Sequence, residues 1–208
     1  MRMRTNYSWL IAMLLLVGCA GTPNYVDNEA LLKSERDIQQ TGIDMHNPDM
    51  SAAISALNDG KLMVAKTLLL GLTQRYPLAG KPWVNVGLIS FRRGDLDHAQ
   101  QAAERALELQ PEIAVADYLL GLIAHKRNDA PKALEHYLAA LEKDQQHANS
   151  HYNLALLYDT YYQDLENAIF HYRRYLELNA NEDEDEVTLS WVKELESQLA
   201  PEGGDDAN

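Results

Sequence analysis

The 208-residue sequence predicts an all-α fold built from short helices arranged as successive pairs. Three observations favour this fold class. Alanine, leucine, glutamate and glutamine, which all favour helices, are abundant. Small residues and prolines recur along the chain at an interval of 34 residues, and a polar turn precedes each recurrence. A repeat of this length indicates helix pairs that bury their apolar faces only by stacking on neighbouring pairs.

The register is clearest in four alanines that each follow a polar turn. Ala65, Ala99 and Ala133 are 34 residues apart, and Ala168 follows after 35. Other small residues, leucines and prolines keep the same register: Gly87, Gly121 and Ala155; Leu107, Leu141 and Leu176; Pro77 and Pro111. Small residues at these positions let two helices approach closely, and larger ones would overpack the contact by about 1 to 3 kcal/mol each. Single helices of about a dozen residues are unstable in water, so we expect the pairs to share one core.

Residues 80–113 resemble one unit of the tetratricopeptide repeat family. The residues on the family's signature positions are Trp83, Val86, Gly87, Gly94, Ala99, Ala106, Leu107 and Pro111. The resemblance implies a right-handed tetratricopeptide solenoid of about four helix pairs within residues 28–199. Its repeats are expected at about 46–79, 80–113, 114–147 and 148–182, with an N-terminal helix in 28–40 and a C-terminal capping helix at 184–199.

The four units depart from the family pattern to different degrees. The unit 46–79 lacks the tryptophan and the glycine of the first helix, which makes it a degenerate repeat. The unit 114–147 has Asp117 in place of the tryptophan. The unit 148–182 has one additional residue within 159–163, so we expect an altered turn there.

The N-terminus has the pattern of a secretory leader. Arg2 and Arg4 precede an apolar run over 9–17, which is too short to span a bilayer. The run Leu16-Val17-Gly18-Cys19 resembles the lipobox of bacterial lipoproteins. The resemblance implies that residues 1–18 are removed, that Cys19 carries a covalent lipid, and that 19–27 form a tether. The alternative is an ordinary signal peptide cut near Ala20, which leaves a free thiol.

The lipoprotein resemblance also predicts a location. Several acyl chains anchor a protein firmly where one chain does not, because each buried methylene contributes roughly 0.8 kcal/mol. Ala20 stands where an aspartate favours retention in the inner membrane, so the sequence resembles the outer-membrane sorting pattern. We expect a palmitate-type lipid anchor in the periplasmic face of the outer membrane.

The charge of the chain excludes several classes of partner. A formal net charge of −13 disfavours binding to nucleic acid and to anionic lipid headgroups. The sequence has no nucleophile elbow, phosphate-binding loop or zinc-protease motif, so we expect no enzyme activity, no small-molecule substrate and no cofactor besides the lipid. His147 and His151 have helical spacing, but without further ligands we expect no metal site. Residues 200–208 are expected to form a disordered acidic tail.

The tetratricopeptide resemblance also implies where a partner would bind. Family members contact ligands through the concave face, which is lined by the first helix of each pair. Spacings of four place the corresponding side chains on one helix face. These predicted groove residues are Val84, Asn85, Leu88, Phe91 and Arg92; Tyr118, Leu122, His125 and Lys126; Tyr152, Asn153, Leu156 and Asp159. The alternative is that the leucines belong to the core and that neighbouring helices close the groove.

These features predict a non-catalytic envelope lipoprotein that binds a partner protein. It resembles the outer-membrane repeat lipoproteins that act as pilotins or accessory factors, so we expect a role in assembling a pilus or secretion complex. An adaptor for peptidoglycan enzymes or periplasmic proteases is the alternative.

Overall fold

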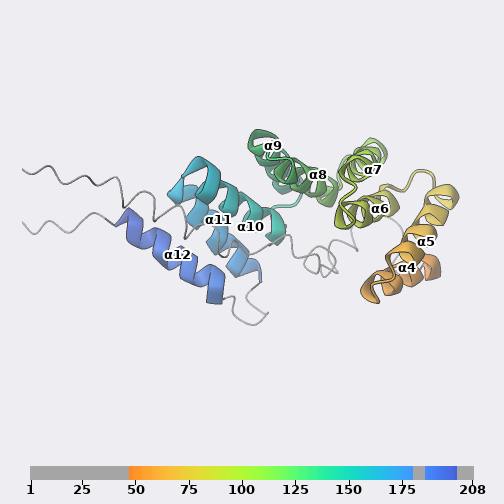
Figure 1. Cartoon of the computed structure of the whole chain (residues 1–208), viewed down its shortest axis with the longest axis horizontal. Helices are drawn as coiled ribbons and strands as arrows, with labels where there is room; N and C mark the ends of the chain where they lie inside the picture. The colour runs from red at the N-terminus through yellow and green to blue at the C-terminus, as the bar shows by residue number, and fades with distance from the viewer. Residues whose placement is uncertain (1–46, 180–185, 201–208) are drawn as a thin grey trace, which may run out of the picture. The chain divides into compact units, whose positions relative to one another are not determined.

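A computed structural model describes residues 47–179 and 186–200, and all regular structure in these two ranges is helical (Figure 1). The predicted leader, tether and N-terminal helix lie outside the described residues, as does the tail after residue 200. The helices are α4 (Pro48–Asn58), α5 (Leu62–Arg75), α6 (Gly80–Arg92), α7 (Leu96–Leu109), α8 (Ala114–Lys126), α9 (Ala130–Lys143), α10 (Ala148–Leu157), α11 (Leu165–Leu178) and α12 (Glu186–Leu199), with a π-helical turn η1 (Tyr158–Tyr162) after α10.

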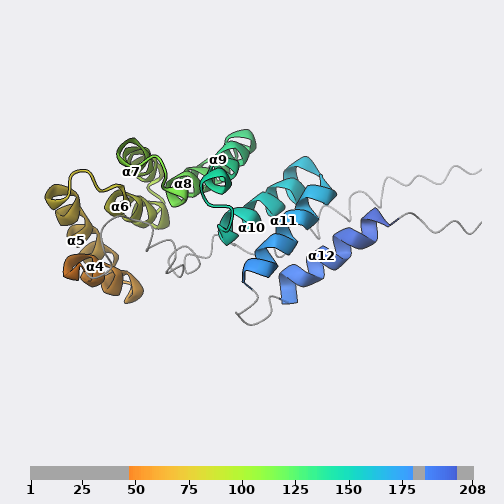
Figure 2. The ribbon, with the colours of Figure 1, turned by 180° about the vertical axis from the view of Figure 1, so that it is seen from behind.

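Each helix packs against the next one along the chain, from α4 through to α12 (Figures 1 and 2). The pairs are α4 with α5, α6 with α7, α8 with α9, and α10 with α11. Helix α6 also contacts α8, so the first helices of two consecutive pairs touch. Short connections make the two helices of a pair antiparallel. The predicted all-α fold of stacked helix pairs is therefore confirmed.

The turns inside the pairs repeat with the same interval as the sequence. Each turn contains one residue with positive φ: Gly60 at 72°, Gly94 at 78°, Asn128 at 59° and Gln163 at 54°. Their separations are 34, 34 and 35 residues. This left-handed conformation is easy for glycine and acceptable for asparagine, but it is unusual for glutamine. The turn therefore keeps its shape while the residue type becomes less suited to it.

The second helix of the last three pairs begins at an aspartate N-cap. Asp95, Asp129 and Asp164 accept a hydrogen bond from the backbone N–H three residues ahead, at 3.3, 3.3 and 3.1 Å. Such a cap satisfies one of the free N–H groups in the first helical turn. The aspartates found in the turns of the sequence thus have a structural role.

The alanine register forms the centre of the core. Ala65, Ala99, Ala133 and Ala168 are fully buried. A β-carbon on Gly87 would lie 2.8 Å from Leu119 Cδ2 and 3.1 Å from the Ala99 backbone oxygen, so this glycine permits α6, α7 and α8 to pack closely. These contacts explain why small residues recur at the interval of 34.

The additional residue of the last repeat is absorbed in η1. Where the second and third pairs turn directly after the first helix, the fourth inserts the π-helical turn Tyr158–Tyr162. Single π-helical turns accommodate one extra residue inside helical structure. The altered turn predicted at 159–163 is therefore present, and it displays Tyr161 and Tyr162 on the surface.

The last helix covers the final pair. Helix α12 packs on α11 and buries Thr188, Val192 and Leu195. The Trp191 ring lies 5.8 Å from the Tyr172 ring and 6.4 Å from the Tyr152 ring, so it closes the aromatic end of the core. Of the range predicted for the capping helix, residues 184 and 185 lie outside the described residues.

Candidate functional site

The predicted groove residues lie on the first helices of three successive pairs. Helices α6, α8 and α10 carry all of them except Asp159, which belongs to η1. Since α6 contacts α8, and both α8 and α10 contact α9, the fold places the three helices in series. Whether a partner binds there stays a prediction.

The expected exposure of this strip is wrong. Leu88 and Leu122 are only 3% and 2% exposed, so the alternative that they belong to the core holds for both. Six further side chains of the set are also buried: Val84, Asn85, Phe91, Tyr118, Tyr152 and Asn153. The helix period identified one face of each helix, but it could not show how much of that face the fold covers.

Asn85 and Asn153 were expected to bind a peptide backbone, but their amide groups have partners in the chain. The Asn85 Nδ2 donates to the Lys81 carbonyl oxygen at 3.1 Å. The Asn153 Nδ2 donates to the Asn149 carbonyl oxygen at 2.9 Å and to the Tyr118 hydroxyl oxygen at 3.2 Å. These donors satisfy buried polar groups, so they stabilise the fold.

Tyr118 joins two successive pairs. Its ring lies 5.9 Å from the Tyr137 ring of the same pair and 4.8 Å from the His147 ring, which precedes the next pair. The hydrogen bond from Asn153 adds a polar contact across the same boundary. Tyr118 is therefore an interface residue between repeats, which its groove position did not reveal.

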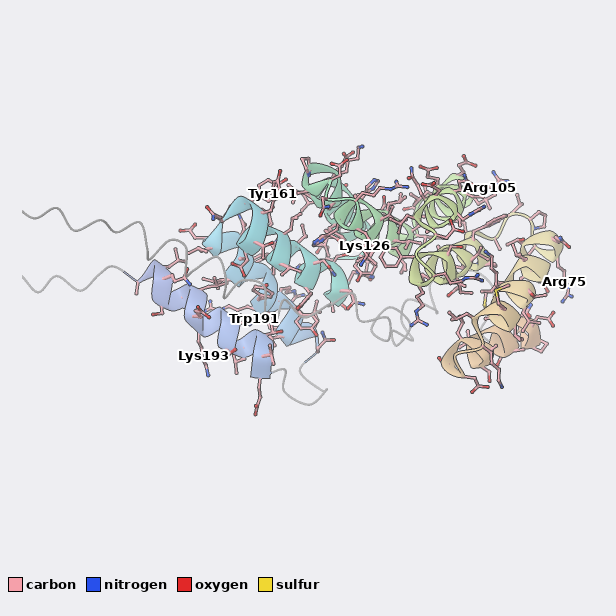
Figure 3. The ribbon with its side chains drawn as sticks, viewed as in Figure 1. Arg75, Arg105, Lys126, Tyr161, Trp191 and Lys193 are labelled. Atoms are coloured by element: carbon pink, nitrogen blue, oxygen red, sulfur yellow. The ribbon has the colours of Figure 1, made fainter. Side chains whose placement is uncertain are left out.

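Accessible side chains remain at the C-terminal ends of the three helices. Lys126 is exposed, and Arg92, His125, Leu156 and Asp159 are half-buried. We call these five residues the helix-end surface; Figure 3 shows Lys126 at the end of α8. Burial, and next the charge of Lys126, lower the pKa of His125, so this imidazole is neutral at pH 7. The helix-end surface therefore has two cations, one carboxylate and two uncharged side chains.

Lys81, in the first turn of α6, was missed by the sequence analysis. Its side chain is fully buried, and its Nζ has no hydrogen-bond partner. Burial lowers the pKa of Lys81 to about 7, because a charged ammonium is unfavourable without water or an anion. A lysine in the first turn of an amphipathic helix normally extends into solvent, so no sequence signal pointed to it.

Asp117, which replaces the family tryptophan, is held by two basic side chains of α9. Lys143 Nζ donates to Asp117 Oδ2, and His136 Nδ1 lies 3.4 Å from Oδ1. Burial alone would raise the pKa of Asp117, but these two hydrogen bonds hold it below its ordinary value. The cluster links the two helices of one pair and is structural.

The last repeat contains a buried histidine pair. His151 Nδ1 lies 2.9 Å from His171 Nδ1, so one nitrogen donates and the other accepts, and His151 Nε2 lies 3.2 Å from the Gln145 carbonyl oxygen. The Tyr158 ring stacks on His171 at 5.6 Å with an angle of 10°. Burial, and next the proximity of His151, lower the pKa of His171 to about 4.

A second group of polar side chains meets where η1, α11 and α12 come together. Asp159, Tyr172 and Glu194 interact electrostatically, and Trp191 contacts the Tyr172 ring. Sequence analysis assigned Asp159 to the groove and Tyr172 to an aromatic cluster, but it did not identify Glu194. An acidic residue on a capping helix reads as ordinary solvated surface, so only the packing of α12 brings it to this place.

Metal and membrane sites were also sought in the described ranges. Within 47–179 and 186–200, no three histidine, cysteine or acidic side chains are placed to hold a metal ion. His147 instead contacts the Ser150 hydroxyl at 2.8 Å, so it does not converge with His151. Among the same residues, no helix has the length and apolar character needed to cross a membrane.

Comparison with known families and proteins supports this description. The tetratricopeptide repeat family profile matches residues 87–148. The mouse (Mus musculus) Superkiller complex protein 3 is 29% identical over 136 residues, which cover 63% of this chain and 9% of that protein. The chain therefore spans about a tenth of the length of the curated relative it matches.

Solved structures show the same fold at low sequence identity. A tetratricopeptide repeat protein from Parabacteroides merdae superposes with a TM-score of 0.56 at 19% identity, covering 73% of this chain and 60% of that one. MamA from Desulfovibrio magneticus RS-1 gives 0.53 at 21% identity, covering 76% and 98%. The first TPR of Spaghetti (RPAP3), bound to the HSP90 peptide SRMEEVD, gives 0.52 at 17% identity, covering 58% and 95%. The described residues thus form a tetratricopeptide helix-pair solenoid.

Proposed function

We propose that this chain is a non-catalytic, lipid-anchored scaffold of the bacterial envelope that holds a partner protein at the helix-end surface. The tetratricopeptide fold is suited to protein–protein interaction, and proteins of this fold are generally non-catalytic. The first TPR of Spaghetti has a bound peptide and shares this fold, which supports a polypeptide as the guest.

The observation that carries the proposal is the division of each first helix into a buried part and an accessible end. The early turns of α6, α8 and α10 are buried, while Arg92, Lys126 and Leu156 retain exposure at the helix ends. Arg92 and Lys126 are 34 residues apart, so they occupy equivalent positions in successive repeats. A surface that combines charged, aliphatic and aromatic neighbours is typical of the rim of a protein interface.

The site-specific test uses a photo-crosslinking amino acid at Lys126 in cells. We expect a covalent adduct with a distinct envelope protein from position 126. The matched control is position 132 on α9, where Lys132 is 69% exposed and pairs with Asp129 at 2.9 Å. Equal adducts from both positions, or none from position 126, would contradict binding at the helix-end surface.

The identity of the adduct decides between two roles. Secretin or pilus components would support our proposal that the chain assists assembly of a pilus or secretion complex. Peptidoglycan hydrolases or periplasmic proteases would support the second candidate, an adaptor for such enzymes. Both candidates depend on the same envelope location.

The lipid anchor is tested separately from the binding surface. The lipobox-like run ending at Cys19 supports acylation of this cysteine in the periplasmic face of the outer membrane. Cys19→Ser should therefore remove the protein from the outer-membrane fraction. Continued fractionation with that membrane would overturn acylation at Cys19, and it would leave the binding proposal unaffected.

A further inference from the structure

The end of the solenoid contains two carboxylates and a hydroxyl drawn from three different elements. Asp159 lies in η1, Tyr172 in α11 and Glu194 in α12. Helix α11 packs against both η1 and α12, so it brings the two acidic elements to one place. Glu194 is exposed, Asp159 is half-buried and Tyr172 is fully buried, which gives the group an open rim and a closed floor.

The two carboxylates have no compensating cation among the described residues. Burial, and next the charge of Glu194, raise the pKa of Asp159, so the carboxylates repel each other. Lys193 adjoins Glu194 in sequence, but it points away from the side of α12 that carries Trp191 (Figure 3). The neighbouring arginines are engaged elsewhere, in the pairs Arg173–Glu196 at 2.6 Å and Arg174–Glu177 at 2.8 Å.

The Tyr172 hydroxyl is a third oxygen without a partner. It is fully buried and makes no hydrogen bond, an arrangement that native proteins rarely keep without a reason. Burial raises the pKa of Tyr172, and the charge of Asp159 raises it further, so the phenol lies within the field of this carboxylate. An incoming donor would satisfy this oxygen and compensate both acids together.

An aromatic wall stands beside these oxygens. Trp191 is one helical turn before Glu194, so the two side chains lie on one face of α12. The Trp191 ring is half-buried, and its centre lies 5.8 Å from that of Tyr172. A tryptophan face attracts organic cations at distances of up to about 6 Å.

We propose that Asp159, Glu194, Trp191 and the Tyr172 hydroxyl form a pocket that receives a lysine or arginine side chain of the partner protein. We call these four residues the cation pocket. The inference rests on the proposed function, because Asp159 belongs to the helix-end surface, and it specifies the chemistry that the partner presents there.

A metal ion fits this group less well than an organic cation. Calcium takes six to eight oxygen ligands, and magnesium requires near-octahedral geometry. The cation pocket offers two carboxylates and one phenol oxygen. A guanidinium or ammonium needs only a few acceptors and also benefits from the indole face.

The test titrates the full chain, solubilised in a non-ionic detergent, with a short glycine-serine peptide that contains one central arginine. A matched peptide carries citrulline, which has the same shape without the charge. The indole N–H signal of Trp191 reports binding by nuclear magnetic resonance, and the indole of Trp83 on α6 is an internal control. We expect a saturable shift of the Trp191 signal with the arginine peptide only.

Three variants assign the binding to the pocket. Asp159→Asn and Glu194→Gln should each weaken the arginine peptide roughly tenfold, since each removes one charge-assisted hydrogen bond. Glu186→Gln is the matched control, because it removes one acidic charge from an exposed position at the start of α12. It should leave the affinity within about twofold.

Tyr172→Phe separates binding from folding. Loss of the hydroxyl removes a buried oxygen without a partner, so the melting temperature should stay the same or rise while the affinity falls several-fold. A lower melting temperature with unchanged affinity would mean that the hydroxyl serves only the fold.

Two outcomes would overturn the cation pocket: equal shifts with the arginine and citrulline peptides, or unchanged binding in Asp159→Asn and Glu194→Gln. This failure is distinguishable from failure of the proposed function. Adducts at position 126 without arginine-dependent binding would retain the helix-end surface and remove the pocket. Arginine-dependent binding without adducts at position 126 would do the reverse.

Discussion

Gly121 of α8 packs directly against the ring of Tyr137 of α9, so closely that a β-carbon at Gly121 would overlap the ring edge. Tyr137 is fully buried and among the largest buried side chains of the described residues. The glycine thus exchanges its own side chain for an aromatic ring supplied by the partner helix. This exchange explains why one repeat can bury a tyrosine in a core otherwise built from alanines.

Gly121→Ala should therefore destabilise the protein. The added methyl group must displace Tyr137 or separate the helices, and overpacking of this kind costs about 1 to 3 kcal/mol. Gly71→Ala is the control, because Gly71 is an exposed residue of α5 with no atom within 4 Å of a built β-carbon. That change should stabilise by about 0.5 to 1 kcal/mol through helix propensity alone. Urea unfolding followed by circular dichroism measures both, and equal effects would contradict the close contact.

The repeat register was predictable because each position has a local physical cause. Ala99 and Gly87 are small since helices meet there, and Pro111 follows the end of α7 because it lacks an amide donor. These requirements recur in every unit, so they appear in the sequence as a period. The helix pairs could therefore be placed without any knowledge of long-range contacts.

The accessible part of the site was not predictable from the same pattern. Helical spacing placed Leu122 and Lys126 on one face of α8, yet Leu122 is buried and Lys126 is exposed. The difference arises from how far neighbouring elements reach along each helix, which depends on tertiary packing. The approach of Glu194 to Asp159 has the same origin, because it depends on where α12 lies.

The turns inside the pairs predict opposite effects for two substitutions. Gly94 has φ of 78°, so Gly94→Ala forces an alanine into the left-handed region and should destabilise by about 1 kcal/mol. Gln163 has φ of 54° at the equivalent position of the last pair, so Gln163→Gly should be neutral or stabilising by a few tenths of a kcal/mol. Thermal melts of the two variants check the prediction. Destabilisation by Gln163→Gly would show that its side chain outweighs the backbone strain.

Asp117 should contribute stability that acid removes. Its pKa is depressed in the folded protein, so the contribution is fully present above about pH 4 and is lost as the pH falls through the lower folded pKa. Asp117→Asn leaves Lys143 and His136 without an anion and should cost roughly 1 to 3 kcal/mol at pH 7. Asp97→Asn is the control, since Asp97 is 86% exposed and pairs with Arg127 at 2.5 Å. Little change is expected there. Unfolding curves at pH 7 and pH 3 should show the Asp117→Asn penalty shrinking in acid, and a constant penalty would contradict it.

The buried histidine pair should make stability depend on pH in a higher window. His171 titrates at about 4 in the folded protein against 6.5 for the free side chain, so between these values the unfolded chain binds the additional proton. Stability should therefore be unaffected by His171 above pH 6.5 and fall as the pH decreases towards 4, by about 3 kcal/mol at most. His171→Gln keeps a hydrogen-bonding group beside His151 but does not titrate, so it should flatten this slope. His98→Gln, at an exposed site paired with Asp95, should keep it. Denaturant unfolding at half-unit pH steps decides: parallel curves for wild type and His171→Gln would mean that the pair is not held neutral by burial.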